Sequence, residues 1–366
     1  MKQPIKKIAL LTGGGDCPGL NAVIRAVTRA AILKYGYEVI GYKFGYRGLY
    51  NNDFVKLDLD SVSGILHRGG TILHSSNKDN LFDYQVEDEK GNIVKKDVSY
   101  VGVENLKKEG VDALVVIGGD GTLTSARDFS RLGVNVIGVP KTIDNDLLAT
   151  DVTFGFNTAT EIATEALDRL HTTAESHHRV MVLEVMGRNA GWIALESGIA
   201  GSADVILLPE IPYDINKIVE KVKERERLGK EFTIIVVAEG AKPKDGEVVV
   251  SKIVKDSPDP IRLGGIANKI ANDLEALIKN HEVRSTVLGH IQRGGNTSTY
   301  DRILSTKYGV KAVELIDENL FGNMVALKGN KISYESLENV IGNTKNVDPE
   351  GELVKTAKSI GISFAD

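Results

Sequence analysis

Two aspartates separated by one residue stand in a polar segment, Pro140-Lys141-Thr142-Ile143-Asp144-Asn145-Asp146, which follows an apolar run. Paired carboxylates can divide the work of a group transfer. One takes a proton from an attacking hydroxyl, and the other orients a cation or the water bound to a metal. The alternative is a turn rich in Asn and Asp, which both residues favour for backbone reasons. Taken alone, the segment is better explained as such a turn, but a glycine-rich motif upstream of it favours the catalytic interpretation.

That upstream motif is Gly118-Gly119-Asp120-Gly121-Thr122, which follows another apolar run. Asp120 can hold Mg²⁺ while the glycine backbone accommodates the phosphates that the metal bridges. The alternative is that Asp120 caps a helix over Leu123–Phe129. The same five-residue motif occurs in lipid kinases and NAD kinases. It therefore indicates a phosphate-donor site and leaves the acceptor open.

A third loop, Thr12–Gly19, stands between an apolar run and an expected helix over Leu20–Ala31. Its glycines let backbone N–H groups approach an anion, and the helix N-terminus adds a positive dipole. The loop is neither a dinucleotide fingerprint nor a Walker A loop. Taken alone, it is equally well a structural turn.

Arginines and hydrogen-bonding side chains follow or precede several expected strands in the second half of the chain. Arginine binds a phosphate dianion in a bidentate manner, so the set favours a pocket for a phosphorylated substrate. Each arginine alone is more often part of a surface ion pair. The set comprises His178, Arg179, Met186, Gly187, Arg188, Glu239, Gly240, Arg284 and the segment Leu288–Gly295.

Strand-length apolar runs alternate with helix-period segments, which predicts an α/β fold with right-handed crossovers. Most runs are continuous, as in parallel strands that are covered on both faces. Such sheets bind ligands beyond the carboxyl ends of their strands, where these loops stand. The expected strands are Ile8–Thr12, Glu38–Tyr42, Ala113–Ile117, Val136–Val139, Val180–Val185, Val205–Leu208, Thr233–Ala238 and Ser285–Leu288.

A domain break is expected after Gly155-Phe156, because the strand–helix pattern restarts with a helix around Thr160–Thr173. Two stretches resemble insertions. The segment Asp83–Asp97, polar around Lys90-Gly91-Asn92, predicts an exposed hairpin. The segment Ala241–Pro260, with its prolines, predicts a loop that contains a short strand at Val248–Val250.

Length and charge limit the class of protein. A chain of 366 residues predicts two domains. Its net charge of −5 and the lack of a basic tract argue against a nucleic-acid partner. The single cysteine, Cys17, excludes a disulfide framework and a cysteine-built metal cage. No apolar run approaches about 18 residues, and no signal peptide is evident. We expect a cytoplasmic enzyme with no membrane partner.

Taken together, the motifs GGGDCPGLNAVIR, GGDGT, PKTIDND, EVMGRNAGWIAL, LLPE and VLGHIQRGG resemble the 6-phosphofructokinase family in order and spacing, over about residues 5–320. The resemblance implies two Rossmann-like α/β domains with mainly parallel sheets flanked by helices and the active site in the cleft between them. The expected division is 1–156 plus about 294–345 for the nucleotide domain, and 157–293 plus about 346–366 for the sugar-phosphate domain.

The resemblance also implies a reaction, transfer of a phosphoryl group from ATP to the 1-hydroxyl of fructose 6-phosphate, assisted by Mg²⁺ at Asp120. Asp144 would accept the proton, with Thr142 and Asp146 assisting, and Arg188 is suited to stabilise charge on the transferring group. The nucleotide would contact Gly14, Gly15, Asn77 or Lys78, Gly119, Asp120, Gly121 and Thr122. The sugar phosphate would contact Thr142, Ile143, Asp144, Arg179, Met186, Gly187, Arg188, Glu239, Arg284, His290, Ile291, Gln292 and Arg293.

In similar enzymes Arg179 and Arg284 reach across from a neighbouring subunit, which implies a homo-oligomer. A tetramer is the usual bacterial form, and a dimer is the alternative. Arg25 and Arg29 stand where bacterial relatives bind effectors. The Ala241–Pro260 insertion and Glu231 break that pattern, so we expect altered or absent control by those effectors.

Two positions bear on the phosphoryl donor. Relatives that use pyrophosphate typically carry Asp at the position of Gly121, where a carboxylate would crowd and repel an α-phosphate. Gly121 therefore favours ATP. Lys141 is a feature of the pyrophosphate type, but a lysine also neutralises the phosphates of ATP. The alternative function is a pyrophosphate-dependent fructose-6-phosphate 1-phosphotransferase. A non-enzymatic sensor would lack Asp120, Asp144 or Arg188, and all three are present.

Overall fold

The computed structural model describes residues 4–87, 91–253 and 260–366. The chain divides into two compact units. Unit 1 comprises Met1–Ile143, Leu147–Gly155 and Arg293–Asn343, and unit 2 comprises Asp144–Asp146, Phe156–Gln292 and Thr344–Asp366. The chain therefore crosses between the units several times, and one of these crossings encloses only the three residues Asp144–Asp146.

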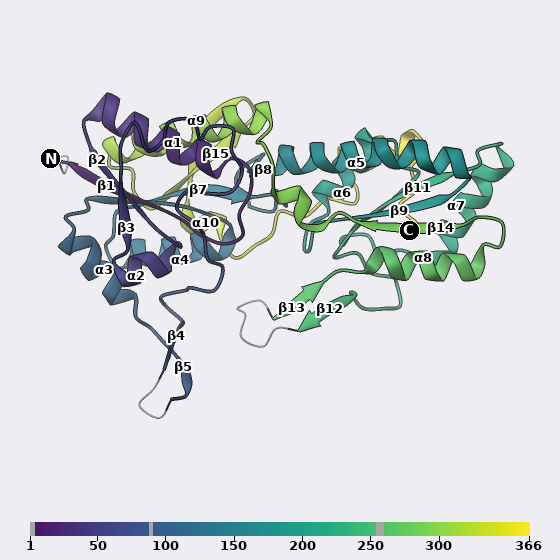
Figure 1. Cartoon of the computed structure of the whole chain (residues 1–366), viewed down its shortest axis with the longest axis horizontal. Helices are drawn as coiled ribbons and strands as arrows, with labels where there is room; N and C mark the ends of the chain where they lie inside the picture. The colour runs from purple at the N-terminus through teal and green to yellow at the C-terminus, as the bar shows by residue number, and fades with distance from the viewer. Residues whose placement is uncertain (1–3, 88–90, 254–259) are drawn as a thin grey trace. The chain divides into compact units, whose positions relative to one another are not determined.

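Unit 1 is built on a mixed, mainly parallel sheet with strand order β16-β15-β7-β6-β1-β2-β3, in which β8 pairs with β7 (Figure 1). Only the outer pairs β2–β3 and β15–β16 are antiparallel. The strands are β1 (Lys7–Thr12), β2 (Glu38–Tyr42), β3 (Phe54–Leu57), β6 (Ala113–Gly118), β7 (Val136–Thr142), β8 (Phe154–Gly155), β15 (Asn323–Lys328) and β16 (Lys331–Ser336).

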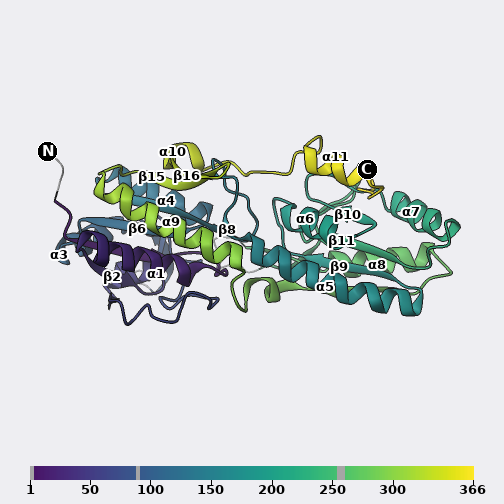
Figure 2. The ribbon, with the colours of Figure 1, turned by 90° about the horizontal axis from the view of Figure 1, so that it is seen from above.

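Helices cover both faces of this sheet (Figure 1), and Figure 2 looks onto the side of α1 and α9. This covering explains why the central strands are mainly apolar and buried. One face packs against α2, α3, α4 and α10, in a core that includes Leu49, Leu106, Phe129 and Leu337. The helices are α1 (Leu20–Ala30, continued by a π-helical turn, Ala31–Tyr35), α2 (Tyr46–Asn51), α3 (Ser99–Lys108), α4 (Asp120–Arg131), α9 (Thr299–Asp317) and α10 (Leu337–Val340).

Unit 2 contains a wholly parallel sheet of order β10-β11-β9-β14. Helices α7 and α8 close one face through residues such as Ile218 and Ile270. The strands are β9 (Val180–Val185), β10 (Val205–Leu207), β11 (Thr233–Ala238) and β14 (Val283–Val287). The helices are α5 (Phe156–His177), α6 (Trp192–Ala200), α7 (Ile215–Arg227), α8 (Ile266–Leu277) and α11 (Glu352–Ser359), and a 3₁₀ helix covers Gly289–Arg293. The predicted α/β class with mainly parallel sheets is confirmed.

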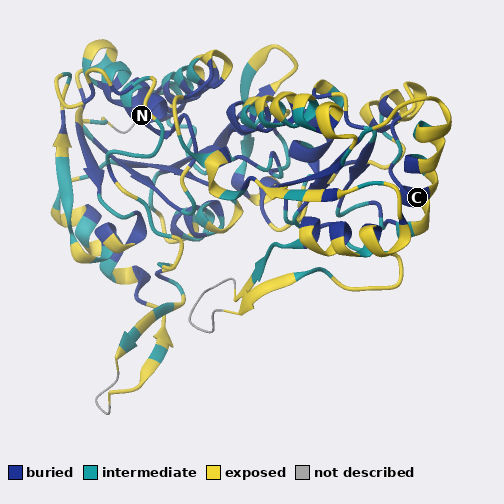
Figure 3. Ribbon diagram, turned by 45° about the vertical axis from the view of Figure 1, so that its right-hand side comes forward, coloured by how far each residue is buried: buried dark blue, intermediate teal, exposed yellow. Residues whose placement is uncertain are grey.

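Both expected insertions contain antiparallel hairpins with exposed strands (Figure 3). The first pairs β4 (Tyr84–Glu87) with β5 (Ile93–Lys96), as predicted, although Lys90 lies outside the described residues. The predicted strand at Val248–Val250 is wrong. The strand is β12 (Val250–Ile253), and its register is set by β13 (Ile261–Leu263), a partner that the sequence pattern did not indicate. Val249 instead packs against the core of unit 2.

Strand β7 is longer than its apolar run predicts, and this extension positions the site. Its neighbour β8 pairs Lys141 with Phe154 and Thr142 with Gly155, which carries the strand past Pro140. Lys141 and Thr142 are therefore held at the carboxyl end of a sheet strand rather than in a free loop. In the part of the chain that the structure describes, no helix has the length and apolar character required to cross a bilayer.

Candidate active site

The two glycine-rich loops of unit 1 lie against each other at the carboxyl ends of β1 and β6. The amide of Gly13 donates to the carbonyl of Ile117 at 2.9 Å. A Cβ atom at Gly13 would lie 2.6 Å from Cγ2 of Thr122, so the loops pack closely only because this position lacks a side chain. The arrangement directs the N-termini of α1 and α4 to the same edge of the sheet, where their dipoles favour an anion.

Helix α4 begins at Asp120, with Gly119 as its N-cap residue and no side-chain cap. The alternative that Asp120 caps a helix over Leu123–Phe129 is therefore wrong, because Asp120 already belongs to the first turn. Its exposed side chain accepts a hydrogen bond from the amide of Gly342 at 3.3 Å. A Cβ atom at Gly121 would meet no described atom within 4 Å. The position beside Asp120 is thus open.

Two cations of unit 1 approach the Gly14–Asp16 backbone. Lys141, only 5% exposed, donates from Nζ to the carbonyl of Gly15 at 2.5 Å. Arg293 donates from a terminal guanidinium nitrogen to the carbonyl of Asp16 at 3.1 Å. The expected sugar-phosphate residue Arg293 therefore lies against the first glycine loop. The sequence could not indicate this placement, because the contact joins residues 277 positions apart.

The segment expected to supply Asn77 or Lys78 also contacts the first glycine loop. The amide of Gly14 donates to the carbonyl of Ser76 at 3.0 Å, and the Ser75 hydroxyl donates to the carbonyl of Gly14. Asn77 and Lys78 follow directly and are exposed. The structure thus brings these two residues to the same edge of unit 1 as the glycine loops.

The residues around Asp120 suit a magnesium ion that takes most of its ligands from water and phosphate. Among residues 4–87, 91–253 and 260–366, no cluster of three or more His, Cys, Asp or Glu side chains is arranged to hold a metal. An all-protein cage is therefore not formed there. Mg²⁺ commonly takes one or two carboxylates and completes its shell with waters and substrate phosphates. The exposed carboxylate of Asp120, next to the open position of Gly121, suits that arrangement.

In unit 2, three of the expected sugar-phosphate residues line one cavity. Met186, Glu239 and His290 border a space of about 240 Å³ beyond the carboxyl ends of β9, β11 and β14. The main chain is tightly packed here. A Cβ atom at Gly240 would lie 1.9 Å from the carbonyl oxygen of Arg188, so only glycine fits. The structure therefore brings residues from three separate segments to one pocket, whose lining also includes Val185, Leu263 and Val287.

Gln292 supports this pocket from below the surface. It is fully buried, accepts a hydrogen bond from the amide of Met186 at 3.2 Å and donates to the carbonyl of Gly289 at 2.9 Å. Its role is thus to hold the pocket wall, while the neighbouring Ile291 is 66% exposed. Gly187 is buried and follows Met186 with a φ of +129°, and Arg188 donates to the carbonyl of Ile261 at 3.3 Å.

Sequence reasoning missed Glu184, which also lines the cavity. Its carboxylate is 2% exposed and accepts hydrogen bonds from the amides of Gly265 and Ala267, at 3.0 and 2.9 Å. A carboxylate at a helix N-terminus satisfies amides that have no intrahelical partner. Glu184 therefore ties α8 to β9 behind Met186. A charged residue inside an otherwise apolar strand was the signal in the sequence.

The expected catalytic segment Asp144–Asp146 packs with unit 2, whereas Thr142 and Ile143 belong to unit 1. Ile143 is buried, and Thr142, Asp144 and Asp146 are partly exposed. The main-chain carbonyl of Thr142 accepts a hydrogen bond from the hydroxyl of Thr153 at 2.7 Å. The end of β7 is thus fixed in unit 1, and the two aspartates follow at once.

Arg179 and Arg284 are not brought to the pocket of unit 2. Arg179 precedes β9 and Met186 follows it, and a six-residue strand at about 3.3 Å per residue separates them by roughly 20 Å. Arg284 pairs in register with Met181 near the same amino end. Both arginines form ion pairs with Glu282. They therefore lie together at the amino ends of β9 and β14, whereas the pocket lies at the carboxyl ends.

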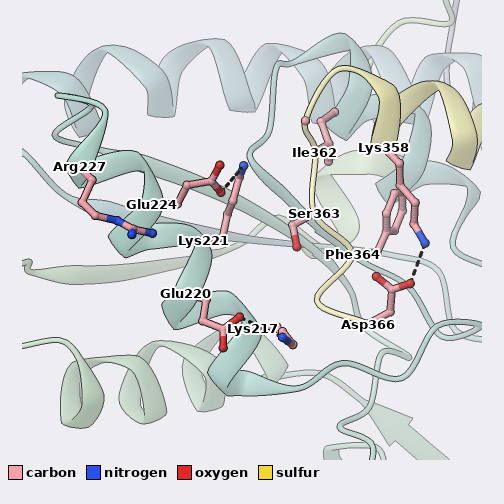
Figure 4. Close-up of a pocket in the computed structure, with 11 residues that line it drawn as sticks. Lys217, Glu220, Lys221, Glu224, Arg227, Lys358, Ile362, Ser363, Phe364 and Asp366 are labelled. Carbon is pink, nitrogen blue, oxygen red and sulfur yellow. Dashed lines mark hydrogen bonds and ion pairs between the residues drawn. The ribbon is translucent and has the colours of Figure 1, made fainter.

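A second hollow of unit 2, of about 600 Å³, contains none of the expected site residues (Figure 4). It lies between α7 and the C-terminal segment. Its lysines are paired, as Lys217 with Glu220, Lys221 with Glu224 and Lys358 with Asp366. With these charges neutralised in pairs, the hollow is a weaker candidate for anion binding than the cavity at Met186.

The model of the family described as Phosphofructokinase matches residues 7–316. An ATP-dependent 6-phosphofructokinase 2 from Clostridium perfringens is 94% identical to this chain over 366 residues, which is 100% of both proteins. A pyrophosphate–fructose 6-phosphate 1-phosphotransferase from Streptomyces coelicolor is 50% identical over 344 residues, 94% of this chain and 96% of that protein. The crystal structure of Pichia pastoris phosphofructokinase in the T-state matches with a TM-score of 0.78 at 31% identity. That match covers 99% of this chain and 37% of the Pichia chain.

Proposed function

The chain belongs to the phosphofructokinase family, and from this premise we propose that it transfers the γ-phosphoryl group of ATP to the 1-hydroxyl of D-fructose 6-phosphate. The products are fructose 1,6-bisphosphate and ADP. The observation that carries the choice of ATP is the open position of Gly121 beside Asp120. The relative that is 94% identical also bears the name of an ATP-dependent enzyme.

Phosphoryl transfer depends mainly on positioning and on stabilising charge, and the residues divide accordingly. Asp144 accepts the proton of the 1-hydroxyl as its oxygen bonds to the γ-phosphorus and the bond to ADP breaks. Thr142 and Asp146 orient the reacting groups, and Arg188 stabilises negative charge on the transferring group. Met186, Glu239 and His290 hold the sugar phosphate in the cavity that they line.

The donor half uses the glycine loops and the cations against them. The N-termini of α1 and α4 face the phosphates with Gly14, Gly15 and Gly119–Thr122, while Lys141 adds positive charge behind Gly15. Mg²⁺, when bound through Asp120, supplies neutralisation of the β- and γ-phosphates. Asn77 and Lys78 border the nucleotide from the segment that contacts Gly14.

A coupled assay of fructose 1,6-bisphosphate formation tests this function. With Mg²⁺ and fructose 6-phosphate, we expect turnover with ATP and little turnover with pyrophosphate at the same concentration, because the space at Gly121 admits an α-phosphate. Turnover with pyrophosphate alone would establish the alternative donor, which the Streptomyces coelicolor relative's name specifies for that protein.

The positions of Arg179 and Arg284 support an oligomer. Both lie at the amino ends of their strands, about one strand length from the cavity of their own unit. They are therefore placed to serve the sugar phosphate of a neighbouring subunit rather than their own. We propose a homotetramer, with a dimer as the smaller assembly that would suffice. Each arginine would leave its contact with Glu282 or share it with the phosphate dianion.

Mixed oligomers test this arrangement. Arg179→Ala and Asp144→Asn subunits should each be nearly inactive alone, and co-assembly should restore activity, because a site with intact Asp144 then receives Arg179 from its neighbour. Co-assembly of Arg179→Ala with Arg284→Ala is the control. It should restore nothing, because each neighbour lacks one arginine. Equal activity of both mixtures would contradict the arrangement, as would no restoration in either.

A further inference from the structure

Asn145, between the two aspartates of the catalytic segment, is held in an unusual state. It is 4% exposed, and its φ of +51° places it in the left-handed region. Asn tolerates this region better than most residues, but it remains a sparsely populated conformation that needs support from its surroundings. Because the turn at Asn145 sets the path of the main chain on both sides, whatever supports Asn145 also orients Asp144.

The support comes from Lys345, 200 residues along the chain. Its Nζ donates to Oδ1 of Asn145 at 2.8 Å, and its backbone amide donates to the carbonyl of Asp146 at 2.9 Å. One residue thus contacts the segment by both its side chain and its main chain. Two contacts from one residue resist rotation of the turn as well as its displacement.

The segment that carries Lys345 is itself anchored within unit 2. The indole Nε1 of Trp192 donates to the carbonyl of Lys345 at 2.7 Å. Two residues later, the amide of Val347 donates to the carboxylate of Glu210 at 2.8 Å, and Glu210 also accepts from the amide of Gly191. Trp192 begins α6, so the support for the catalytic segment extends back to a helix of the sugar-phosphate unit.

The division of the chain reflects these contacts. Asp144–Asp146 groups with unit 2, although Ile143 before it and Leu147 after it group with unit 1. Lys345 is the second residue of the C-terminal segment of unit 2. The catalytic segment therefore contacts mainly the unit that contains the proposed sugar-phosphate cavity, and Lys345 is a direct link in that attachment.

We propose that Lys345 is a positioning residue for phosphoryl transfer, which acts through Asn145 to keep the Asp144 carboxylate oriented for the proton of the 1-hydroxyl. The inference rests on the proposed function and deepens it. A displacement of about 1 Å in a reacting group can lower a rate ~100-fold. Loss of the ammonium group should therefore affect the chemical step more than the binding of either substrate.

Lys345→Met tests this proposal, because it removes the ammonium group and keeps a long apolar side chain. We expect kcat to fall by ~30- to 100-fold, while KM for ATP and KM for fructose 6-phosphate each change less than about threefold, within the scatter of a peripheral substitution. Lys355→Met is the matched control. The Lys355 side chain is 64% exposed, and its ion pair with Glu350 is long, at 3.8 Å between Nζ and the carboxylate oxygen. The control variant should retain the wild-type kcat.

A readout of folding that does not depend on the charge of Lys345 is needed beside the kinetics. The ammonium group of Lys345 lies over the Trp192 ring, 5.8 Å from its centroid, so the emission of Trp192 responds to loss of the charge itself. The far-UV circular dichroism spectrum has no such dependence and should match that of the wild type in Lys345→Met. An unchanged kcat would overturn the proposal. A fall of kcat together with equal rises in both KM values and a changed circular dichroism spectrum would also overturn it, since that pattern indicates a merely structural role.

Asn145→Gly provides a second test, because glycine adopts the left-handed conformation freely and lacks only the amide that Lys345 contacts. We expect a fall in kcat similar to that of Lys345→Met, and no further fall in the double variant, because both changes remove one interaction. Additive losses would overturn the proposal. The wild-type rate with ATP in the same assay separates these outcomes from a failure of the proposed function, which would abolish the wild-type rate itself.

Discussion

Asp144→Asn should lower kcat by about 10³- to 10⁴-fold, the contribution that a positioned general base typically makes. Asparagine has almost the same shape as aspartate, so the segment should keep its contacts with Lys345. The amide cannot accept the proton of the attacking hydroxyl as a carboxylate does. KM for fructose 6-phosphate should therefore change little, while the rate of fructose 1,6-bisphosphate formation falls.

The coupled assay measures this loss, with Asp245→Asn as its control. Asp245 is an exposed aspartate in a loop of unit 2 and is not among the expected site residues. Its neutralisation should therefore leave kcat unchanged. A near-normal kcat for Asp144→Asn would remove Asp144 as the proton acceptor and would return the choice to Asp146.

Gly121→Asp should reduce kcat/KM for ATP by about 100-fold or more. The carboxylate would face the phosphates of the nucleotide, and like charges placed together cost several kcal/mol, at about 1.4 kcal/mol per tenfold. The fold should tolerate the change, because a Cβ atom at this position meets no described atom within 4 Å. An acidic residue in the first turn of α4 also interacts favourably with the helix dipole.

Two further variants separate charge from size at this position. Gly121→Ala adds only a methyl group in open space and should keep most of the ATP activity. Gly121→Asn has nearly the volume of aspartate without its charge and should lie between alanine and aspartate in kcat/KM for ATP. If all three variants use ATP as well as the wild type does, Gly121 does not border the nucleotide.

The expected loops and most strands follow from local patterns in the sequence. Val180–Val185 and Thr233–Ala238 are strands with the predicted bounds, because continuous apolar runs need burial on both faces, which parallel sheets provide. Polar and glycine-rich segments end these runs, so the residue pattern also marks the carboxyl ends of the strands. The loops that carry the donor motif and those that carry the anion-binding residues can therefore be located from the residues alone.

The path of β7 could not be predicted from its residues. Pro140 indicates a strand end, because proline lacks the amide that a sheet ladder needs. The pairing of Lys141 and Thr142 with β8 nevertheless extends the strand beyond it. A strand is stabilised by its partners as well as by its own side chains, so its length depends on segments that local pattern does not include.

Residue types and their spacing alone determined the α/β class and predicted a phosphate-donor motif, a pair of catalytic carboxylates and an anion-binding set, because these signals are local. Only the tertiary structure decided that Arg293 contacts the first glycine loop, that Glu184 ties α8 to β9 behind the cavity at Met186, and that Lys345 contacts Asn145. These contacts join residues 81 to 277 positions apart. Interactions over such separations depend on how sheets and helices pack, and no local pattern encodes them.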